Sequence, residues 1–130
     1  MTTKILIADD EPNILISLEY LMQREGYEVH LARDGLEALT LLRRERPRLV
    51  LLDVMMPHHN GFEVCQALRA DDALKDTLVL MLTAKGRETD IAKGRAMGAD
   101  AYMTKPFSTR ALVQGVRDLL ARGGHGRTAG

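Results

Sequence analysis

The chain has 130 residues, and its 18 Lys and Arg residues balance 18 Asp and Glu residues. This neutrality removes the electrostatic argument for bulk binding to nucleic acid or to a membrane surface. A single cysteine, Cys65, cannot form an internal disulfide, and no apolar run approaches the roughly 20 residues of a membrane span. We therefore expect one soluble, cytoplasmic domain.

The first part of the chain alternates between strand patterns and helix patterns. Short apolar or alternating runs predict strands, and apolar residues spaced three or four positions apart predict helices. Asp10 or Glu11 can cap the first helix, Pro12 suits its first turn, and Gly26 ends it. The predicted elements are strands at 4–8 and 28–32 and helices at about 12–25 and 36–46.

The next segment, 49–53, has four consecutive apolar residues followed by Asp53. Pro47 precedes this run and Pro57 follows it, which bounds a segment of strand length. Such a run predicts a central strand that is buried on both faces. Asp53 would lie at the carboxyl end of this strand, where open α/β sheets bind their ligands.

The remaining segments continue the alternation of strands and helices. Ser108 is a suitable cap for the last helix, and the glycine-rich segment 123–130 is expected to form a flexible tail after a domain spanning 1–122. The predicted elements are helices at 62–70, at 88–97 and after Ser108, and strands at 78–82 and 101–104.

Five strands that are each followed by a helix predict a parallel five-stranded sheet covered on both faces. The expected fold is a doubly wound, three-layer α/β/α sandwich of (βα)₅ type. In the flavodoxin-like strand order 2-1-3-4-5, the first and third strands are neighbours at the topological switch point. This order would bring Asp9, Asp10 and Asp53 together.

Three carboxylates in one crevice repel one another unless a cation or a raised pKa relieves the repulsion. Mg²⁺ is a suitable cation, because it binds one or two carboxylates and is typically completed by water and phosphate oxygens. Lys105 and Thr83 end the fifth and fourth strands and could reach the oxygens of a phosphoryl group. Asp53 is then the candidate nucleophile for an aspartyl phosphate.

Four sequence motifs in this order resemble those of a response regulator receiver domain, and the resemblance covers residues 4–121. They are the acidic pair Asp9-Asp10, the segment LLDVMMPHHNG around Asp53, the segment MLTAK that contains Thr83, and KPF at 105–107. Each motif alone is weak, but their order at the ends of the first, third, fourth and fifth strands, within a full (βα)₅ chain, makes the match specific.

The resemblance implies that Asp53 accepts a phosphoryl group from the phosphohistidine of a sensor histidine kinase or a histidine phosphotransfer protein. Asp10, Asp53 and the backbone carbonyl of Met55 would bind Mg²⁺, with Asp9 acting through water. Lys105 would bind a phosphoryl oxygen, and the Lys105-Pro106 bond would be cis.

The same resemblance assigns Thr83 and Tyr102 to a switch that repacks the surface formed by the fourth helix, the fifth strand and the fifth helix. Met55 and Lys85 occupy the positions that tune the lifetime of the phosphoryl group. Neither residue offers a carboxylate or an amide to position attacking water. We therefore expect a phosphorylated state that lasts minutes or more.

Two other functions remain open from the sequence. A Mg²⁺-dependent phosphatase of the haloacid dehalogenase kind would carry a second carboxylate two residues after the nucleophile, but Met55 occupies that position. A degenerate receiver would act as an interaction domain without phosphorylation, but Asp9, Asp10, Asp53, Thr83 and Lys105 form an intact set. We expect a switch rather than an enzyme with an external substrate. Its downstream effector cannot be read from the sequence, and direct binding to nucleic acid or membrane is not expected.

Overall fold

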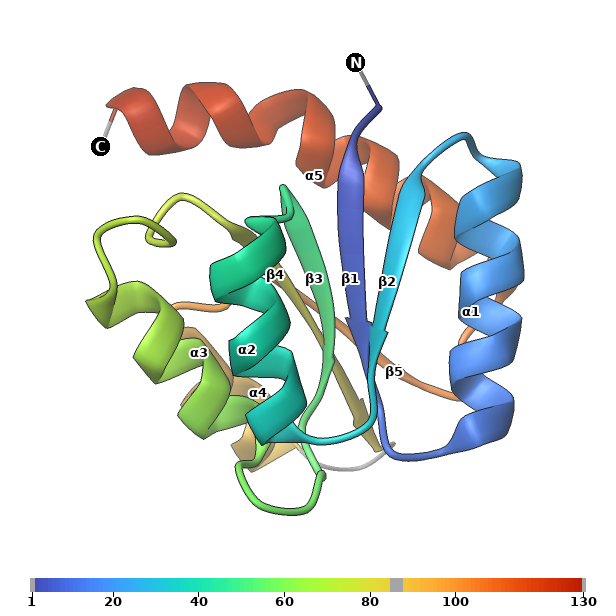
Figure 1. The fold of residues 1–130 in the computed structure, drawn as a ribbon, viewed down its shortest axis with the longest axis horizontal. Coiled ribbons are helices and arrows are strands. Elements are labelled where there is room, and N and C mark those ends of the chain that lie inside the picture. Colours follow the sequence, from blue (N-terminus) through green and yellow to red (C-terminus); the bar gives the residue numbers. More distant parts are fainter. Residues whose placement is uncertain (1, 85–87, 130) are drawn as a thin grey trace.

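The computed structural model describes residues 2–84 and 88–129. Five strands form one parallel sheet in the order β2-β1-β3-β4-β5, which confirms the predicted flavodoxin-like order. Each strand is followed by a helix, as Figure 1 shows. The elements in chain order are β1 (Lys4–Ala8), α1 (Pro12–Arg24), β2 (Glu28–Ala32), α2 (Gly35–Glu45), β3 (Leu49–Asp53), α3 (Gly61–Ala70), β4 (Leu78–Ala84), α4 (Glu88–Met97), β5 (Ala101–Lys105) and α5 (Thr109–Ala129).

The helices cover the sheet on both faces and complete the predicted three-layer sandwich. The apolar residues of α1 and α5 pack on one face, and those of α2 and α3 pack on the other, where Met97 of α4 joins them. Figure 1 shows α1 and α5 on the opposite side of the sheet from α2 and α3. Strand neighbours alternate between these two cores, as the two-residue period of a strand requires.

Strand β3 is the centre of the sheet. It pairs with β1 on one side and with β4 on the other, and all five of its residues are buried. The continuous apolar run that ends at Asp53 is therefore explained by burial on both faces, as the sequence predicts. The register pairs Ala8 with Leu52, so Asp9 and Asp53 leave two adjacent strands at the same level.

Two boundaries differ from the prediction by more than one residue. Strand β4 continues past residue 82, because Thr83 and Ala84 pair with Thr104 and Lys105 of β5. Helix α5 continues to Ala129, whereas we expected the helix to give way to a tail after residue 122. Glycine lowers helix stability by about 1 kcal/mol per residue without removing a backbone donor, so glycines alone do not oblige a helix to stop. The division into a domain and a flexible tail stays a prediction.

Candidate functional site

The carboxylate of Asp9 lies at the carboxyl end of β1 and is completely buried. Its Oδ1 atom accepts the backbone N–H of Glu11 at 2.9 Å. Glu11 is the N-cap residue of α1, but its own side chain forms no capping hydrogen bond. The predicted capping by Asp10 or Glu11 is therefore not observed: the backbone N–H of Glu11 donates to Asp9 instead, and Asp10 is exposed.

Lys105 joins the carboxylates of two different strands. Its Nζ atom lies 2.8 Å from Oδ2 of Asp9 and 3.3 Å from Oδ1 of Asp53. Glu11 contributes a third, longer contact of 3.8 Å. The ammonium group therefore offsets part of the repulsion between Asp9 and Asp53, across the topological switch point.

The carboxyl group of Asp53 is hard to ionise in this arrangement. Burial, and then the negative charge of Asp9, raise the pKa of Asp53 from 3.8 to about 7, although Lys105 opposes this effect. Burial would lower the pKa of Lys105, but its hydrogen bond to Asp9 and the nearby charge of Asp53 outweigh burial and raise it. Additional positive charge at this position would favour the ionised form of Asp53.

The donor set fits a hard divalent cation. Asp9, Asp10 and Asp53 each offer a carboxylate oxygen, and these atoms all lie within 4.8 Å of one another. A pocket of about 260 Å³ opens beside them, which leaves room for water and a small anion. Oxygen ligands and retained water are what Mg²⁺ prefers. The pocket is lined by Asp10, Glu11, Asp53, Val54, Met55, Ala84, Asp90 and Lys105.

The loop after β3 approaches the backbone of Asp53 closely. The N–H of Gly61 donates to the carbonyl of Val54, and a Cβ atom at Gly61 would lie 2.5 Å from the carbonyl oxygen of Asp53. This close approach requires glycine at position 61. Asn60 and Glu63 then form a capping box that starts α3. The loop is thus tied at both ends and presents Met55, which is exposed, to the pocket.

The other residues from the sequence prediction lie around this centre. Thr83 is buried at the end of β4 and does not line the pocket, and within the described part of the chain its hydroxyl has no hydrogen-bond partner. Tyr102 is half-buried and packs against the same core as α3 and α4. The Lys105-Pro106 peptide bond is cis. Lys85, the second predicted lifetime position, lies outside the described residues.

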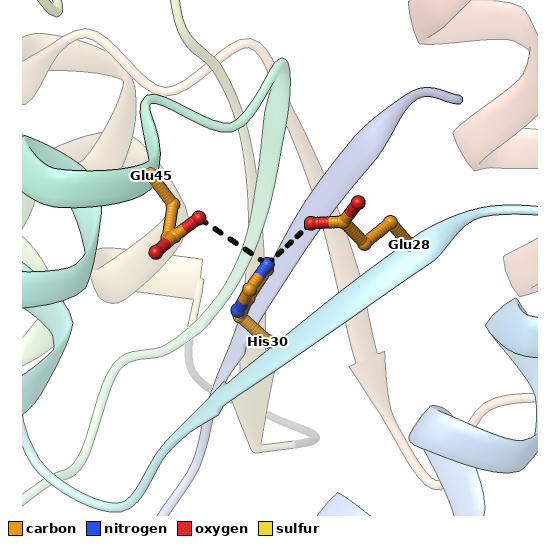
Figure 2. Close-up of side chains that lie close together, drawn as sticks. All are labelled: Glu28, His30 and Glu45. Atoms are coloured by element: carbon orange, nitrogen blue, oxygen red, sulfur yellow. Dashed lines mark hydrogen bonds and ion pairs between the residues drawn. The ribbon is translucent and has the colours of Figure 1, made fainter. Parts of the chain in front are cut away.

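The sequence interpretation missed Asp90 and two polar clusters. Asp90 of α4 lines the pocket, but the weak apolar pattern of 88–97 gave no reason to select it. One cluster joins Glu28, His30 and Glu45 (Figure 2). Strand alternation places His30 on the face opposite Val29 and Leu31, but nothing local pairs it with Glu45.

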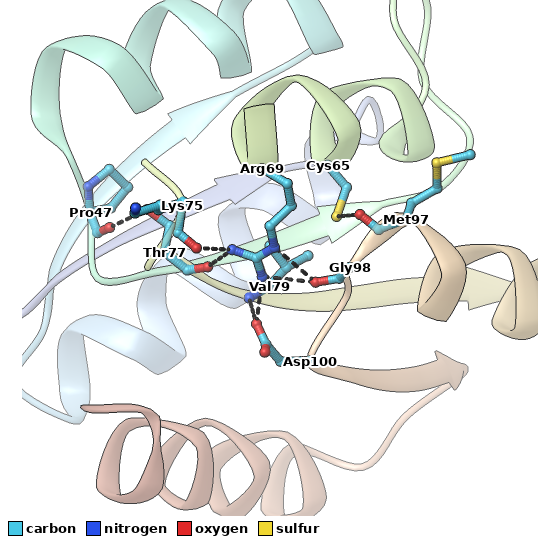
Figure 3. Close-up of polar contacts among 9 residues, drawn as sticks. All are labelled: Pro47, Cys65, Arg69, Lys75, Thr77, Val79, Met97, Gly98 and Asp100. Carbon is cyan, nitrogen blue, oxygen red and sulfur yellow. Dashed lines mark hydrogen bonds and ion pairs between the residues drawn. The ribbon is translucent and has the colours of Figure 1, made fainter. Parts of the chain in front are cut away.

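The second missed cluster is centred on Arg69 of α3 (Figure 3). Its guanidinium group donates to the carboxylate of Asp100 at 2.8 Å, and Asp100 accepts the backbone N–H of Val79. Arg69 falls on the apolar stripe of its helix, and a cation at such a position was the available signal. The guanidinium also donates to the backbone carbonyls of Lys75, Thr77 and Gly98.

Comparison with protein families gives one match over most of the chain. The family model of the response regulator receiver domain matches residues 5–117. The alkaline phosphatase synthesis transcriptional regulatory protein PhoP of Bacillus subtilis (strain 168) is 47% identical over 122 residues, which are 94% of this chain and 50% of PhoP. The chain therefore spans about half the length of this curated relative.

Solved structures give the same result. The chemotaxis response regulator CheY4 of Vibrio cholerae superposes with a TM-score of 0.86 at 34% identity, over 92% of this chain and 99% of that chain. A CheY-like response regulator receiver domain protein from Methanospirillum hungatei JF-1 superposes with a TM-score of 0.90 at 28% identity, over 96% and 98% of the two chains. Separately, none of the helices in the described ranges is both long and apolar enough to cross a membrane.

Proposed function

Because this chain belongs to the response regulator receiver domain family of two-component signalling, we propose that it is a phosphorylation switch whose phosphoacceptor is Asp53. Receiver domains are signalling modules that interact with histidine kinases and downstream effectors, and they are not classical enzymes. The observation that carries the proposal is the position of Asp53, at the end of a fully buried strand and 3.3 Å from the ammonium group of Lys105.

In this proposal a carboxylate oxygen of Asp53 attacks the phosphorus atom of a phosphohistidine on a sensor kinase or a histidine phosphotransfer protein. A phosphorus–oxygen bond forms at Asp53, the bond from phosphorus to the imidazole nitrogen breaks, and the imidazole leaves with its electron pair. Lys105 binds a phosphoryl oxygen and compensates the charge that builds up on it. Ionised Asp53 is the reactive form, and Lys105 favours it.

Asp10, Asp53 and the backbone carbonyl of Met55 would hold Mg²⁺, with Asp9 acting through water. Bound there, Mg²⁺ would supply positive charge beside the phosphoryl oxygens and favour the ionised form of Asp53. The carboxylate oxygens within 4.8 Å of one another support this assignment. Met55 lies on the rim of the same pocket.

We assign Thr83 and Tyr102 to the conformational response. The hydroxyl of Thr83 is buried without a partner in the described part of the chain, so a phosphoryl oxygen on Asp53 could satisfy it after a small movement. Tyr102 neighbours Met81 across the β4-β5 pair, and Met81 lies on the same side of β4 as Thr83. Movement of Thr83 would therefore change the space beneath α4 that Tyr102 fills.

The first test is incubation with acetyl phosphate, with and without Mg²⁺, followed by intact mass measurement. The wild type should gain the mass of one phosphoryl group only with Mg²⁺, and Asp53→Asn should gain none. Asp72→Asn, which changes an exposed aspartate, is the matched control and should behave as the wild type.

Two other results would replace the proposal. No mass gain in the wild type would indicate a degenerate receiver that acts as an interaction domain without phosphorylation. Steady release of inorganic phosphate over many turnovers would indicate an aspartate-nucleophile phosphatase, against which Met55 argues because it offers no general acid.

The lifetime of the phosphoryl group is a separate part of the proposal. Met55 and Lys85 offer neither carboxylate nor amide to orient a water molecule, so loss of the phosphoryl group should take minutes or more. A chase of the phosphorylated chain, free of donor and phosphatase, would measure this rate. Introduction of a carboxamide with Met55→Asn should shorten the lifetime, and loss within seconds in the wild type would contradict the assignment.

A further inference from the structure

A second group of metal-ligating side chains lies at the other end of the sheet from Asp53. Glu28 begins β2, His30 is in the middle of the same strand, and Glu45 ends α2. Each offers one ligand atom, and these atoms all lie within 4.8 Å of one another. Figure 2 shows the imidazole of His30 between the two carboxylates.

The spacing of these atoms suits a small ion. Nε2 of His30 lies 2.7 Å from Oε2 of Glu28 and 3.6 Å from Oε1 of Glu45. A tetrahedral zinc ion with bonds of about 2.0–2.1 Å holds neighbouring ligand atoms roughly 3.4 Å apart. The two observed distances bracket this value, so small side-chain rotations would be enough to admit the ion.

The position already attracts cationic groups. Nζ of Lys4 lies 3.2 Å from Oε1 of Glu45, and Nε of Arg44 lies 2.9 Å from its Oε2. The hydrogen bonds from Arg44 and then from Lys4 lower the pKa of the Glu45 carboxyl, so this ligand is ionised at neutral pH. The Lys4 side chain is 38% exposed, and a long, solvated ammonium group of this kind can be displaced.

The chemistry of the ligands selects the class of ion. One imidazole nitrogen with two carboxylate oxygens suits Zn²⁺ and related divalent transition metals, whereas Mg²⁺ prefers oxygen alone. The three side chains are between a fifth and a half exposed, which leaves an entry path and room for a water molecule as a fourth ligand. We propose that Glu28, His30 and Glu45 form a site for a zinc-class divalent ion, which competes with the ammonium group of Lys4 for Glu45.

The site would join β2 to the end of α2. Bound metal would then stabilise the packing of an edge strand against its neighbouring helix, because an ion that binds only the folded chain adds its binding free energy to stability. This proposal does not depend on phosphorylation of Asp53, and its failure would leave the proposed function unchanged.

The test is a calorimetric titration with zinc chloride in the presence of excess Mg²⁺. The starting protein carries His58→Gln, His59→Gln and His125→Gln, so that His30 is the one histidine left in the sequence. We expect saturable one-to-one binding in the micromolar range and a rise in the thermal unfolding midpoint on addition of zinc.

Three variants of this protein, with Lys75→Met as a control, separate the site from general surface binding. His30→Gln should weaken zinc binding by at least about tenfold, since loss of even an outer-sphere partner costs 10–100-fold. Glu28→Gln should also weaken it. Lys4→Met should strengthen binding severalfold, because it removes the competing ammonium group, while Lys75→Met, at an exposed lysine, should leave it unchanged.

Each contrary result would overturn the proposal. Absence of saturable binding, or binding that survives His30→Gln at full strength, would show that these side chains form only an ion-pair cluster. A Lys4→Met chain with unchanged zinc affinity would contradict the competition at Glu45. The unfolding midpoint without zinc checks that each variant folds. If His30→Gln does not fold, Glu28→Gln still tests the site.

Discussion

Nη2 of Arg69 lies 2.8 Å from Oδ2 of Asp100, and the same oxygen accepts the backbone N–H of Val79. This pair connects α3, the turn before β5 and the start of β4. Arg69 is only 16% exposed and also donates to carbonyls in two turns. No other side chain offers the several fixed N–H donors that these acceptors need.

We expect Arg69→Met to lower the free energy of unfolding by about 2–4 kcal/mol, since it removes the cationic partner of Asp100 and the donor to several backbone carbonyls. Arg69→Lys should recover little of this loss, because one ammonium group cannot serve the separate acceptors. Urea unfolding measures both. Arg43→Met is the matched control, because Arg43 is 58% exposed and its ion pair spans 3.8 Å, so its change should stay within about 0.5 kcal/mol.

Gly94 and Tyr102 restrict each other. A Cβ atom at Gly94 of α4 would lie 2.9 Å from Cε1 of Tyr102. We expect Gly94→Ala to move the tyrosine ring, which offsets the roughly 1 kcal/mol that alanine contributes to a helix. In a Tyr102→Ala background the same change should be stabilising. A double-mutant cycle should therefore give a coupling of about 1 kcal/mol or more, and additive effects would contradict the contact.

Asp53 should make stability depend on pH in a definite direction. Burial raises the pKa of Asp53 to about 7, against 3.8 for the ordinary group. Between these values the folded chain holds a proton that the unfolded chain has released. The contribution of Asp53 to the free energy of unfolding is therefore fully present below the lower value and is lost as pH rises through about 7.

Asp53→Asn removes this loss. Without divalent cations the free energy of unfolding of the variant should exceed that of the wild type by roughly 2–4 kcal/mol at pH 8, since each pKa unit corresponds to about 1.4 kcal/mol. Near pH 4 the two free energies should be equal. Urea unfolding across this range is the measurement. Parallel curves for the two chains would show that Asp53 titrates normally.

Lys105 should compete with Mg²⁺ for the carboxylates of Asp9 and Asp53. We expect Lys105→Met to lose stability without divalent cations, because two buried carboxylates lose their partner. Mg²⁺ should then raise its unfolding midpoint more than that of the wild type. Lys75→Met should respond to Mg²⁺ as the wild type does. An equal or smaller Mg²⁺ effect in Lys105→Met would mean that the ion binds elsewhere.

The buried hydroxyl of Thr83 has no partner in the described residues, so its removal should cost nothing in the unphosphorylated chain. Thr83→Val should be neutral or more stable by up to about 1 kcal/mol in urea unfolding. Thr77→Val provides the contrast, because the buried hydroxyl of Thr77 donates to the carbonyl of Pro47 over a long 3.5 Å. That variant should be less stable by about 1 kcal/mol, and the reverse order would contradict both assignments.

The order of strands and helices could be predicted from the sequence because most elements show the spacing of apolar residues that is typical of their type. The run before Asp53 is apolar at every position since β3 is covered on both faces, and this signal is local. The carboxylates at 9, 10 and 53 could be brought together once the strand order was assumed, and the structure has that order. Residue types at the ends of strands therefore predicted which carboxylates come together.

Contacts that depend on turns could not be predicted in this way. Several acceptors of Arg69 are backbone carbonyls in two turns. Every residue has a backbone carbonyl, so the sequence does not indicate which of them accept these hydrogen bonds. The pairing of His30 with Glu45 depends on how α2 lies over β2, which no local pattern reports. Thr83 is buried and does not line the pocket, and no local pattern in the sequence indicates which side chains at the strand ends face the pocket.

The contact between Lys105 and Asp9 joins residues 96 positions apart, so the candidate site draws on the strands that come first and last along the chain, β1 and β5. During synthesis the ribosome makes Asp9, Asp10 and Asp53 well before Lys105. Until β5 has been made and has paired with β4, the nascent chain carries the acidic residues without their lysine. The full set of charged residues in this pocket is therefore assembled late in synthesis, and a chain truncated before residue 105 would lack the lysine.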